Sequence, residues 1–147
     1  MFSKYILNFK YAFRIRKPIL IFRLACTFLG IIILRKKPLR YVDFAIDYNC
    51  NLKCDHCFKV SLEKDEENNE TRRLTVEDYE RIAGECMALG AVNFSFQGGE
   101  LFLYKDWEKV IKACKPWKNL ISITTNGTML TDDNLNRLRK AGVDILT

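Results

Sequence analysis

The first 40 residues of this 147-residue chain contain no aspartate or glutamate, although they carry ten lysines and arginines. The other 107 residues hold 14 basic and all 18 acidic side chains, and so have a net charge of −4. The formal net charge of +6 therefore describes a basic arm joined to a mildly acidic domain. We expect the arm to bind a surface, and we expect no nucleic-acid partner.

Signals for secretion are also lacking. The long apolar run begins only at residue 18 and is followed by basic residues, which is not the order found in a signal peptide. Of the six cysteines, three are clustered and three are scattered, namely Cys26, Cys86 and Cys114. The chain is too long and too regular in its pattern for a disulfide-stapled mini-domain. A reducing cytoplasm is the expected compartment.

Residues 1–40 form the predicted N-terminal extension. Residues 18–34 are apolar except for a narrow stripe of Arg23, Thr27 and Gly30 along one side of a predicted helix. This run reaches only the lower limit of the roughly 17 to 25 residues that a spanning helix needs, and Arg23 interrupts it. Three interpretations stay open: a helix packed on the domain or a partner, an interfacial helix in peripheral contact with a membrane, and a transmembrane span.

Strands and helices alternate over residues 41–147, the predicted second domain. Apolar periodicity, capping residues and glycines predict strands over 41–47, 91–97, 120–125 and from 143, and helices over 75–89, 105–115 and 131–141. Two of these helices carry stripes that we expect to be buried, which are Tyr79, Ile82, Cys86 and Leu89 in one and Trp107, Val110, Ile111 and Cys114 in the other. A charge-dense segment over 61–73 is predicted to be a surface insertion.

The predicted strands alternate between apolar and polar residues. Phe94 and Phe96 alternate with Ser95 and Gln97, whereas strands buried on both faces have nearly continuous apolar runs. One face suits covering helices, and the polar face suits a wet interior. We therefore predict an α/β fold with an N-terminal helical extension. Its core is a partial parallel (β/α) TIM-like barrel, open around a ligand-lined lumen and truncated after about three and a half βα units.

Three short motifs follow the first three predicted strands. They are "CNLKCDHC" over 50–57, "GGE" over 98–100 and "TNG" over 125–127. In folds built on parallel strands, the reactive site lies at the carboxyl ends of the strands. We therefore expect the three motifs to converge at one edge of the sheet.

The spacing of Cys50, Cys54 and Cys57 is compatible with more than one chemistry. Structural zinc usually takes four ligands as two separated pairs, and no second Cys/His pair follows, although His56 is adjacent. A disulfide between two of these cysteines would leave the third unpaired, and a thioredoxin-like redox pair would need only two of the three thiols. Three thiolates with a vacant fourth position suit a cubane iron–sulfur cluster with one open iron. A zinc-binding interaction module is the alternative.

Together, these motifs resemble those of the radical S-adenosylmethionine (radical SAM) superfamily, and the resemblance covers residues 41–147. It implies that Cys50, Cys54 and Cys57 hold three irons of a 4Fe–4S cluster. S-adenosyl-L-methionine would chelate the fourth iron through its amino and carboxylate groups. The resemblance also implies cofactor-binding roles in all three motifs: His56 beside the adenine, Gly98, Gly99 and Glu100 at the amino group, and Thr125 and Asn126 near the ribose or the substrate.

The activity implied by this resemblance is reductive cleavage of S-adenosyl-L-methionine. Its products are methionine and a 5′-deoxyadenosyl radical that abstracts a hydrogen atom from an unknown substrate. The implied partner is an electron donor such as a flavodoxin or ferredoxin. The strand–helix pattern stops at the start of a fourth strand, so a catalytically incomplete fragment that binds a cluster or a partner is the alternative.

Overall fold

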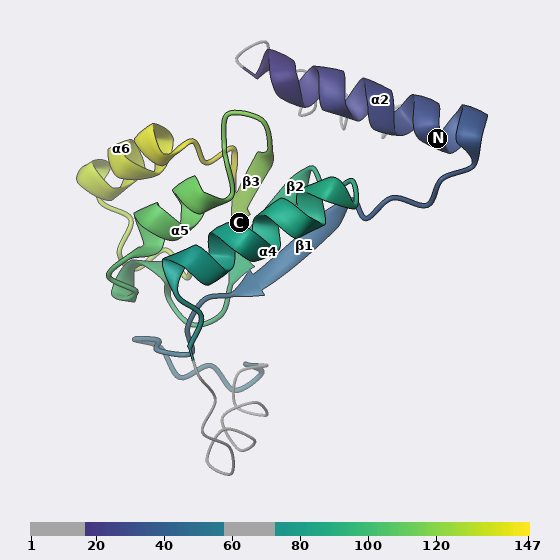
Figure 1. Cartoon of the computed structure of the whole chain (residues 1–147). Helices are drawn as coiled ribbons and strands as arrows, with labels where there is room; N and C mark the ends of the chain where they lie inside the picture. The colour runs from purple at the N-terminus through teal and green to yellow at the C-terminus, as the bar shows by residue number, and fades with distance from the viewer. Residues whose placement is uncertain (1–16, 58–72) are drawn as a thin grey trace, which may run out of the picture.

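The computed structural model describes residues 17–57 and 73–147 (Figure 1). One parallel sheet has the strand order β1-β2-β3-β4, made of β1 Tyr41–Ala45, β2 Asn93–Gln97, β3 Leu120–Ile123 and β4 Ile145–Leu146. The helical elements are α2 Pro18–Leu34, α4 Val76–Ala88, the 3-10 turn η1 Leu101–Leu103, α5 Trp107–Ala113 and α6 Asp132–Ala141. The arm before residue 17 and nearly all of the predicted insertion over 61–73 lie outside the described residues.

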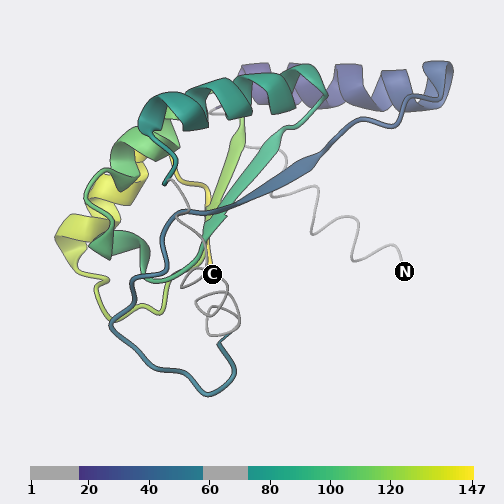
Figure 2. The same ribbon diagram turned by 60° about the horizontal axis from the view of Figure 1, so that its bottom comes forward.

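One face of the sheet is apolar. Phe44 pairs in register with Phe96, and Phe96 pairs with Ile123, so these buried side chains form a row across three strands. Helices α4, α5 and α6 lie side by side on this face (Figure 2). Tyr79 of α4 meets the Phe44 ring edge-on at 5.2 Å between ring centres. Burial of this apolar surface is the main force that holds the helices on the sheet.

The opposite face of the sheet is polar. Asp43, Ser95 and Ser122 stand in one register row across β1, β2 and β3. The structure therefore confirms a parallel α/β fold with one apolar and one polar face, as the alternation in the strands predicts. Closure into a barrel requires strands beyond these four and stays a prediction.

The ends of the helices follow the sequence signals closely. Thr75 and Asp78 form a reciprocal capping box at the start of α4, and the Thr131 hydroxyl accepts from the Asn134 amide at the start of α6. The prediction that Leu89 is buried was wrong, because its side chain is 66% exposed. Leu89 is the C-cap residue just after the last helical residue, Ala88, and its N–H still donates to Glu85 O.

Two of the scattered cysteines belong to the core. Cys114 is fully buried, and burial raises the pKa of its thiol to about 12. Burial also raises the pKa of the partly buried Cys86 thiol. Because only a thiolate binds metal strongly, these two residues act as small apolar side chains, in agreement with the sequence prediction.

Helix α2 is fastened to the amino-terminal edge of the sheet by two cations. The Lys17 ammonium donates to Asn119 O at 3.0 Å and Gly142 O at 3.1 Å, and lies 2.6 Å from an oxygen of the Asp144 carboxylate. The Arg23 guanidinium donates to Ala91 O at 2.8 Å and to Asn119 Oδ1. Arg23, the charged member of the polar stripe of α2, thus faces the domain, which supports the first interpretation of this helix.

Asn119 is the residue that receives α2 on the domain. Its side chain is fully buried, and Asn119 Nδ2 donates to Cys114 O at 2.7 Å while Asn119 Oδ1 accepts from Arg23. A buried amide of this kind is costly unless both of its ends are paired. Within residues 17–57 and 73–147, no helix is long and apolar enough to cross a membrane.

Replacement of Arg23 by methionine tests this attachment. The substitution Arg23→Met keeps an apolar stem but leaves Asn119 Oδ1 and Ala91 O without their donor. We expect it to lower the free energy of unfolding in urea by about 1–3 kcal/mol. The matched substitution Lys37→Met alters an exposed cation and is expected to change stability by less than about 0.5 kcal/mol. Equal effects of the two substitutions would contradict the attachment.

Candidate functional site

Three loops meet at the carboxyl edge of the sheet. They follow β1, β2 and β3, which all run in the same direction. Pairing continues beyond the strands, because Ile46 N donates to Gln97 O at 3.0 Å and Thr124 N donates to Phe96 O at 2.9 Å. This edge lies at the opposite end of the sheet from α2 (Figures 1 and 2). The convergence expected from the order of the motifs is therefore confirmed.

Backbone hydrogen bonds join the "GGE" segment to the start of the cysteine loop. Gly99 N donates to Asp47 O at 2.6 Å, and Glu100 N donates to Asn49 O at 2.8 Å. These bonds fix the chain immediately before Cys50 against the loop that follows β2. The cysteine loop therefore starts from a defined point on the sheet edge.

The two glycines of this segment are required by the close approach of the two chains. Gly98 has φ of +131°, which disfavours any residue with a side chain, and a Cβ there would lie 2.4 Å from Asp47 O. A Cβ on Gly99 would lie 1.9 Å from Asn49 O. We expected these glycines to let backbone approach a cofactor. In the structure, what comes so close is the backbone of residues 47–49.

Glu100 is a buried carboxylate, with a side chain that is only 1% exposed. Its two oxygens accept from the Thr125 hydroxyl at 2.8 and 2.9 Å, and one of them accepts from Asn126 N at 3.0 Å. Glu100 also caps η1 by accepting from Phe102 N at 3.4 Å. The carboxylate therefore ties the "GGE" loop to the "TNG" loop.

A closed ring of side-chain hydrogen bonds joins the "TNG" loop to the cysteine loop. Asn126 Nδ2 donates to Asn51 Oδ1 at 2.8 Å, and Asn51 Nδ2 donates to the Thr128 hydroxyl at 2.7 Å. The Thr128 hydroxyl donates in turn to Asn126 Oδ1 at 2.6 Å. Asn126 Nδ2 also lies 3.7 Å from Cys50 Sγ, in donor geometry.

The three clustered cysteines are free thiols near the protein surface. Cys54 is exposed, Cys50 and Cys57 are half-buried, and Cys57 N donates to Cys54 O at 3.2 Å in a turn. His56 is exposed in the same turn. In the part of the chain that the structure describes, no three Cys, His, Asp or Glu side chains are grouped closely enough to hold a metal ion.

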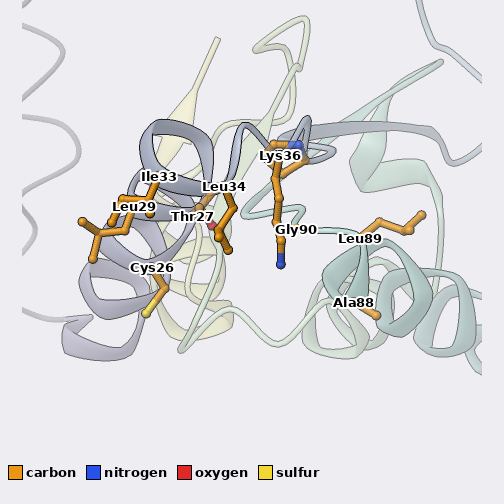
Figure 3. Close-up of a pocket in the computed structure, with 11 residues that line it drawn as sticks. Cys26, Thr27, Leu29, Ile33, Leu34, Lys36, Ala88, Leu89 and Gly90 are labelled. Carbon is orange, nitrogen blue, oxygen red and sulfur yellow. The ribbon is translucent and has the colours of Figure 1, made fainter.

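A separate apolar groove lies beside α2, remote from these loops (Figure 3). Its volume is about 540 Å³, and it lies between the second half of α2 and the corner that follows α4. Leu29 and Ile33 line it from α2, and the stem of Lys36 crosses it. The groove contains none of the predicted site residues.

Comparison with known proteins identifies the family. A family model described as the radical SAM superfamily matches residues 46–147, which is more than half of the chain. The chain belongs to the radical SAM superfamily. Family members use a 4Fe–4S cluster and S-adenosyl-L-methionine, and the curated relatives are radical SAM enzymes.

Curated relatives of this radical SAM chain differ in what they make. A probable GTP 3′,8-cyclase from Methanocella arvoryzae is 34% identical over 95 residues, which are 65% of this chain and 29% of that protein. The subtilosin biosynthesis protein AlbA of Bacillus subtilis is 28% identical over 67% of this chain and 21% of AlbA. The PqqA peptide cyclase of Granulibacter bethesdensis is 31% identical over 67% of this chain and 25% of the cyclase. The chain thus spans less than a third of the length of each.

Solved structures share the fold of this radical SAM chain. BtrN in its open conformation superimposes with a TM-score of 0.59 at 21% identity, over 75% of this chain and 49% of BtrN. Streptococcus suis SuiB bound to S-adenosylmethionine superimposes with a TM-score of 0.53 at 26% identity, over 84% of this chain and 25% of SuiB.

The residues of the carboxyl edge fit the family's cluster in their chemistry. Cys50, Cys54 and Cys57 supply three thiol ligands on one loop, and no disulfide occupies them. Thiolates are the normal ligands of such clusters. Backbone hydrogen bonds fix the chain just before Cys50. Binding of a cluster would therefore require movement only in the segment that carries the three cysteines.

Some residues of this edge were missed by the sequence analysis. Asn51 and Thr128 complete the ring with Asn126, and neither was singled out. The available signal was the presence of amide and hydroxyl side chains directly beside each motif, in loops that parallel strands bring together. Thr125 was expected near the ribose or the substrate, whereas in the structure its hydroxyl is bonded to Glu100.

The close approach at Gly99 can be tested by adding a methyl group. Gly99→Ala places a Cβ against the backbone oxygen of Asn49, which cannot move without breaking the pairing. We expect the free energy of unfolding to fall by about 1–3 kcal/mol. Gly84→Ala is the matched control. Gly84 lies in α4 with no atom within 4 Å of an added Cβ, so alanine should stabilise by about 0.5–1 kcal/mol. Stabilisation by both substitutions would refute the close approach.

Proposed function

We propose that this chain contributes the cluster-binding part of a radical SAM enzyme. Cys50, Cys54 and Cys57 would hold three irons of a 4Fe–4S cluster and leave the fourth for S-adenosyl-L-methionine. When bound and reduced, the cluster supplies the electron that cleaves S-adenosyl-L-methionine to methionine and a 5′-deoxyadenosyl radical, which takes a hydrogen atom from the substrate. The main support for this proposal is that the "CNLKCDHC", "GGE" and "TNG" loops converge at one edge of the sheet in a member of this family.

The loops after β2 and β3 would bind and orient the nucleoside cofactor. The Glu100 carboxylate is held in place by Thr125 and Asn126, and it would accept a hydrogen bond from the cofactor's amino group. Gly98 and Gly99 would serve indirectly, by keeping the cysteine loop against Glu100. The backbone at His56 would border the adenine.

The four strands would form part of a (β/α) barrel, with residues 41–147 as its catalytic domain and residues 1–40 as an extension. The polar face of the sheet, with Asp43, Ser95 and Ser122, would then line the interior. The substrate class stays open: the relatives include a GTP cyclase and a peptide cyclase, and one solved SuiB complex contains the precursor peptide SuiA. An electron donor such as a flavodoxin or ferredoxin would reduce the cluster.

Iron content tests the cluster directly. Anaerobic reconstitution should give about four irons per chain, and reduction with added S-adenosyl-L-methionine should release 5′-deoxyadenosine. Replacing Cys50, Cys54 or Cys57 with serine should abolish both. Cys26→Ser is the control, since it removes an exposed free thiol from α2 and should leave the iron content unchanged. Stoichiometric zinc without iron uptake would refute the proposal. Iron uptake without cleavage of S-adenosyl-L-methionine would indicate a catalytically incomplete fragment.

We also propose that the outer face of α2 makes peripheral contact with an anionic membrane surface. Lys17 and Arg23 face the domain, so the opposite side of the helix carries no charge. That side exposes large apolar side chains, with exposed fractions of 66% for Phe28 and 64% for Ile32. The exposed cations Arg35, Lys36 and Lys37 follow at the end of the helix and complement anionic headgroups.

Vesicle binding tests this second proposal. The protein should sediment with vesicles of phosphatidylcholine and phosphatidylglycerol, and less with phosphatidylcholine alone or at high salt. Phe28→Glu with Ile32→Glu should abolish sedimentation. Leu135→Glu should have no effect, because it places a negative charge on an exposed leucine of α6 and leaves α2 unchanged. Retained binding by the double variant would refute the contact. A dimer in solution that the double variant converts to a monomer would instead assign this face to a second copy of the chain.

A further inference from the structure

Asn126 lies within hydrogen-bond distance of one of the predicted cluster ligands. Its side-chain nitrogen is 3.7 Å from Cys50 Sγ, a normal separation for an amide donor and sulfur. The two residues are far apart in the chain and meet because β1 and β3 flank β2 in one parallel sheet. We propose that Asn126 donates a hydrogen bond to the Cys50 thiolate and thereby raises the reduction potential of the bound cluster. This inference rests on the proposed function.

The orientation of the Asn126 amide is determined by its partners. Thr128 N donates to Asn126 Oδ1 at 2.9 Å, and a backbone N–H can only donate. The atom that faces Thr128 must therefore be the oxygen, and the NH₂ group must face the cysteine loop. The ring supports the same assignment, because Asn126 Nδ2 donates to Asn51 Oδ1 at 2.8 Å.

All hydrogen-bonding positions of the Asn126 amide are used. Oδ1 accepts from Thr128 N and from the Thr128 hydroxyl, and one N–H donates to Asn51. The remaining N–H points at Cys50 Sγ. No rotation of the amide keeps the ring and removes the donor from the sulfur. In the structure, the bonds to Thr128 and Asn51 therefore hold this donor beside Cys50 Sγ.

A donor beside a cluster thiolate affects electron transfer in a defined direction. The cluster gains one electron on reduction and becomes more negative, and part of that charge lies on the cysteine sulfurs. A hydrogen bond to a sulfur stabilises the reduced form more than the oxidised form, so it raises the reduction potential. Asn126 is thus a positioning residue that acts through Cys50 and does not itself need to touch the substrate.

The test compares variants of Asn126 after anaerobic reconstitution. Each protein is titrated with dithionite against redox mediators, and the reduced cluster is followed by electron paramagnetic resonance. Asn126→Leu removes the donor without adding charge. At a fixed solution potential it should lower the ratio of reduced to oxidised cluster about tenfold, equivalent to about 59 mV for one electron. Asn126→Asp removes the donor and adds a negative charge, so its ratio should fall further.

Thr128→Val is the matched control. It breaks the ring at the hydroxyl but keeps the Thr128 backbone N–H that orients the amide, so the donor to Cys50 stays. Its ratio of reduced to oxidised cluster should therefore match that of the wild type. Wild-type potentials in the Asn126 variants, with clusters fully formed, would overturn the inference and leave the proposed function intact. Failure of the wild-type chain to take up iron would instead refute the proposed function.

Discussion

Two backbone hydrogen bonds at the carboxyl edge of the sheet hold the candidate site together. Gly99 N bonds to Asp47 O and Glu100 N bonds to Asn49 O, which brings the loop after β2 against the start of the cysteine loop. Neither bond forms if a side chain stands on Gly98 or Gly99, because a Cβ would meet backbone atoms at 2.4 Å or less. The position of Glu100, and through it that of Thr125 and Asn126, follows from this pairing.

The two ends of the sheet have different roles: one binds helix α2 and the other carries the candidate site. The amino-terminal edge receives α2, whose Lys17 and Arg23 use carbonyl oxygens, the Asn119 amide and the Asp144 carboxylate as acceptors. The carboxyl edge bears thiols, an acid and amides on loops that a parallel sheet brings together. The helical layer buries the apolar row of Phe44, Phe96 and Ile123 between these ends. Substitutions in α2 are therefore expected to weaken the attachment of this helix and the stability of the fold more than they alter the chemistry of the site at the carboxyl edge.

Much of the fold could be predicted from local sequence patterns. Alternation in the strands predicted the two faces of the sheet, and Thr75, Thr131 and Gly142 marked helix ends that the structure confirms. Local patterns could not predict partners that are distant in the chain. Arg23 looked like an interruption of an apolar helix, yet it binds Asn119, which lies 96 residues away. Leu89 fitted the helical period but lies just beyond the end of the helix.

For the candidate site, too, some features could be predicted from the sequence and others could not. The order of the three motifs predicted their convergence, because parallel strands place their carboxyl ends together. The bonds among Asn51, Asn126 and Thr128 depend on loop geometry that no spacing encodes. The roles of Cys50, Cys54 and Cys57 stay predictions that rest on family membership and donor chemistry.

Electron paramagnetic resonance of the reduced, reconstituted protein with and without S-adenosyl-L-methionine tests the central claim most directly. Three cysteine ligands leave one iron free, so the account predicts a 4Fe–4S spectrum that changes when S-adenosyl-L-methionine binds that iron. A cluster spectrum that is unchanged by saturating S-adenosyl-L-methionine would contradict an open iron at this edge of the sheet.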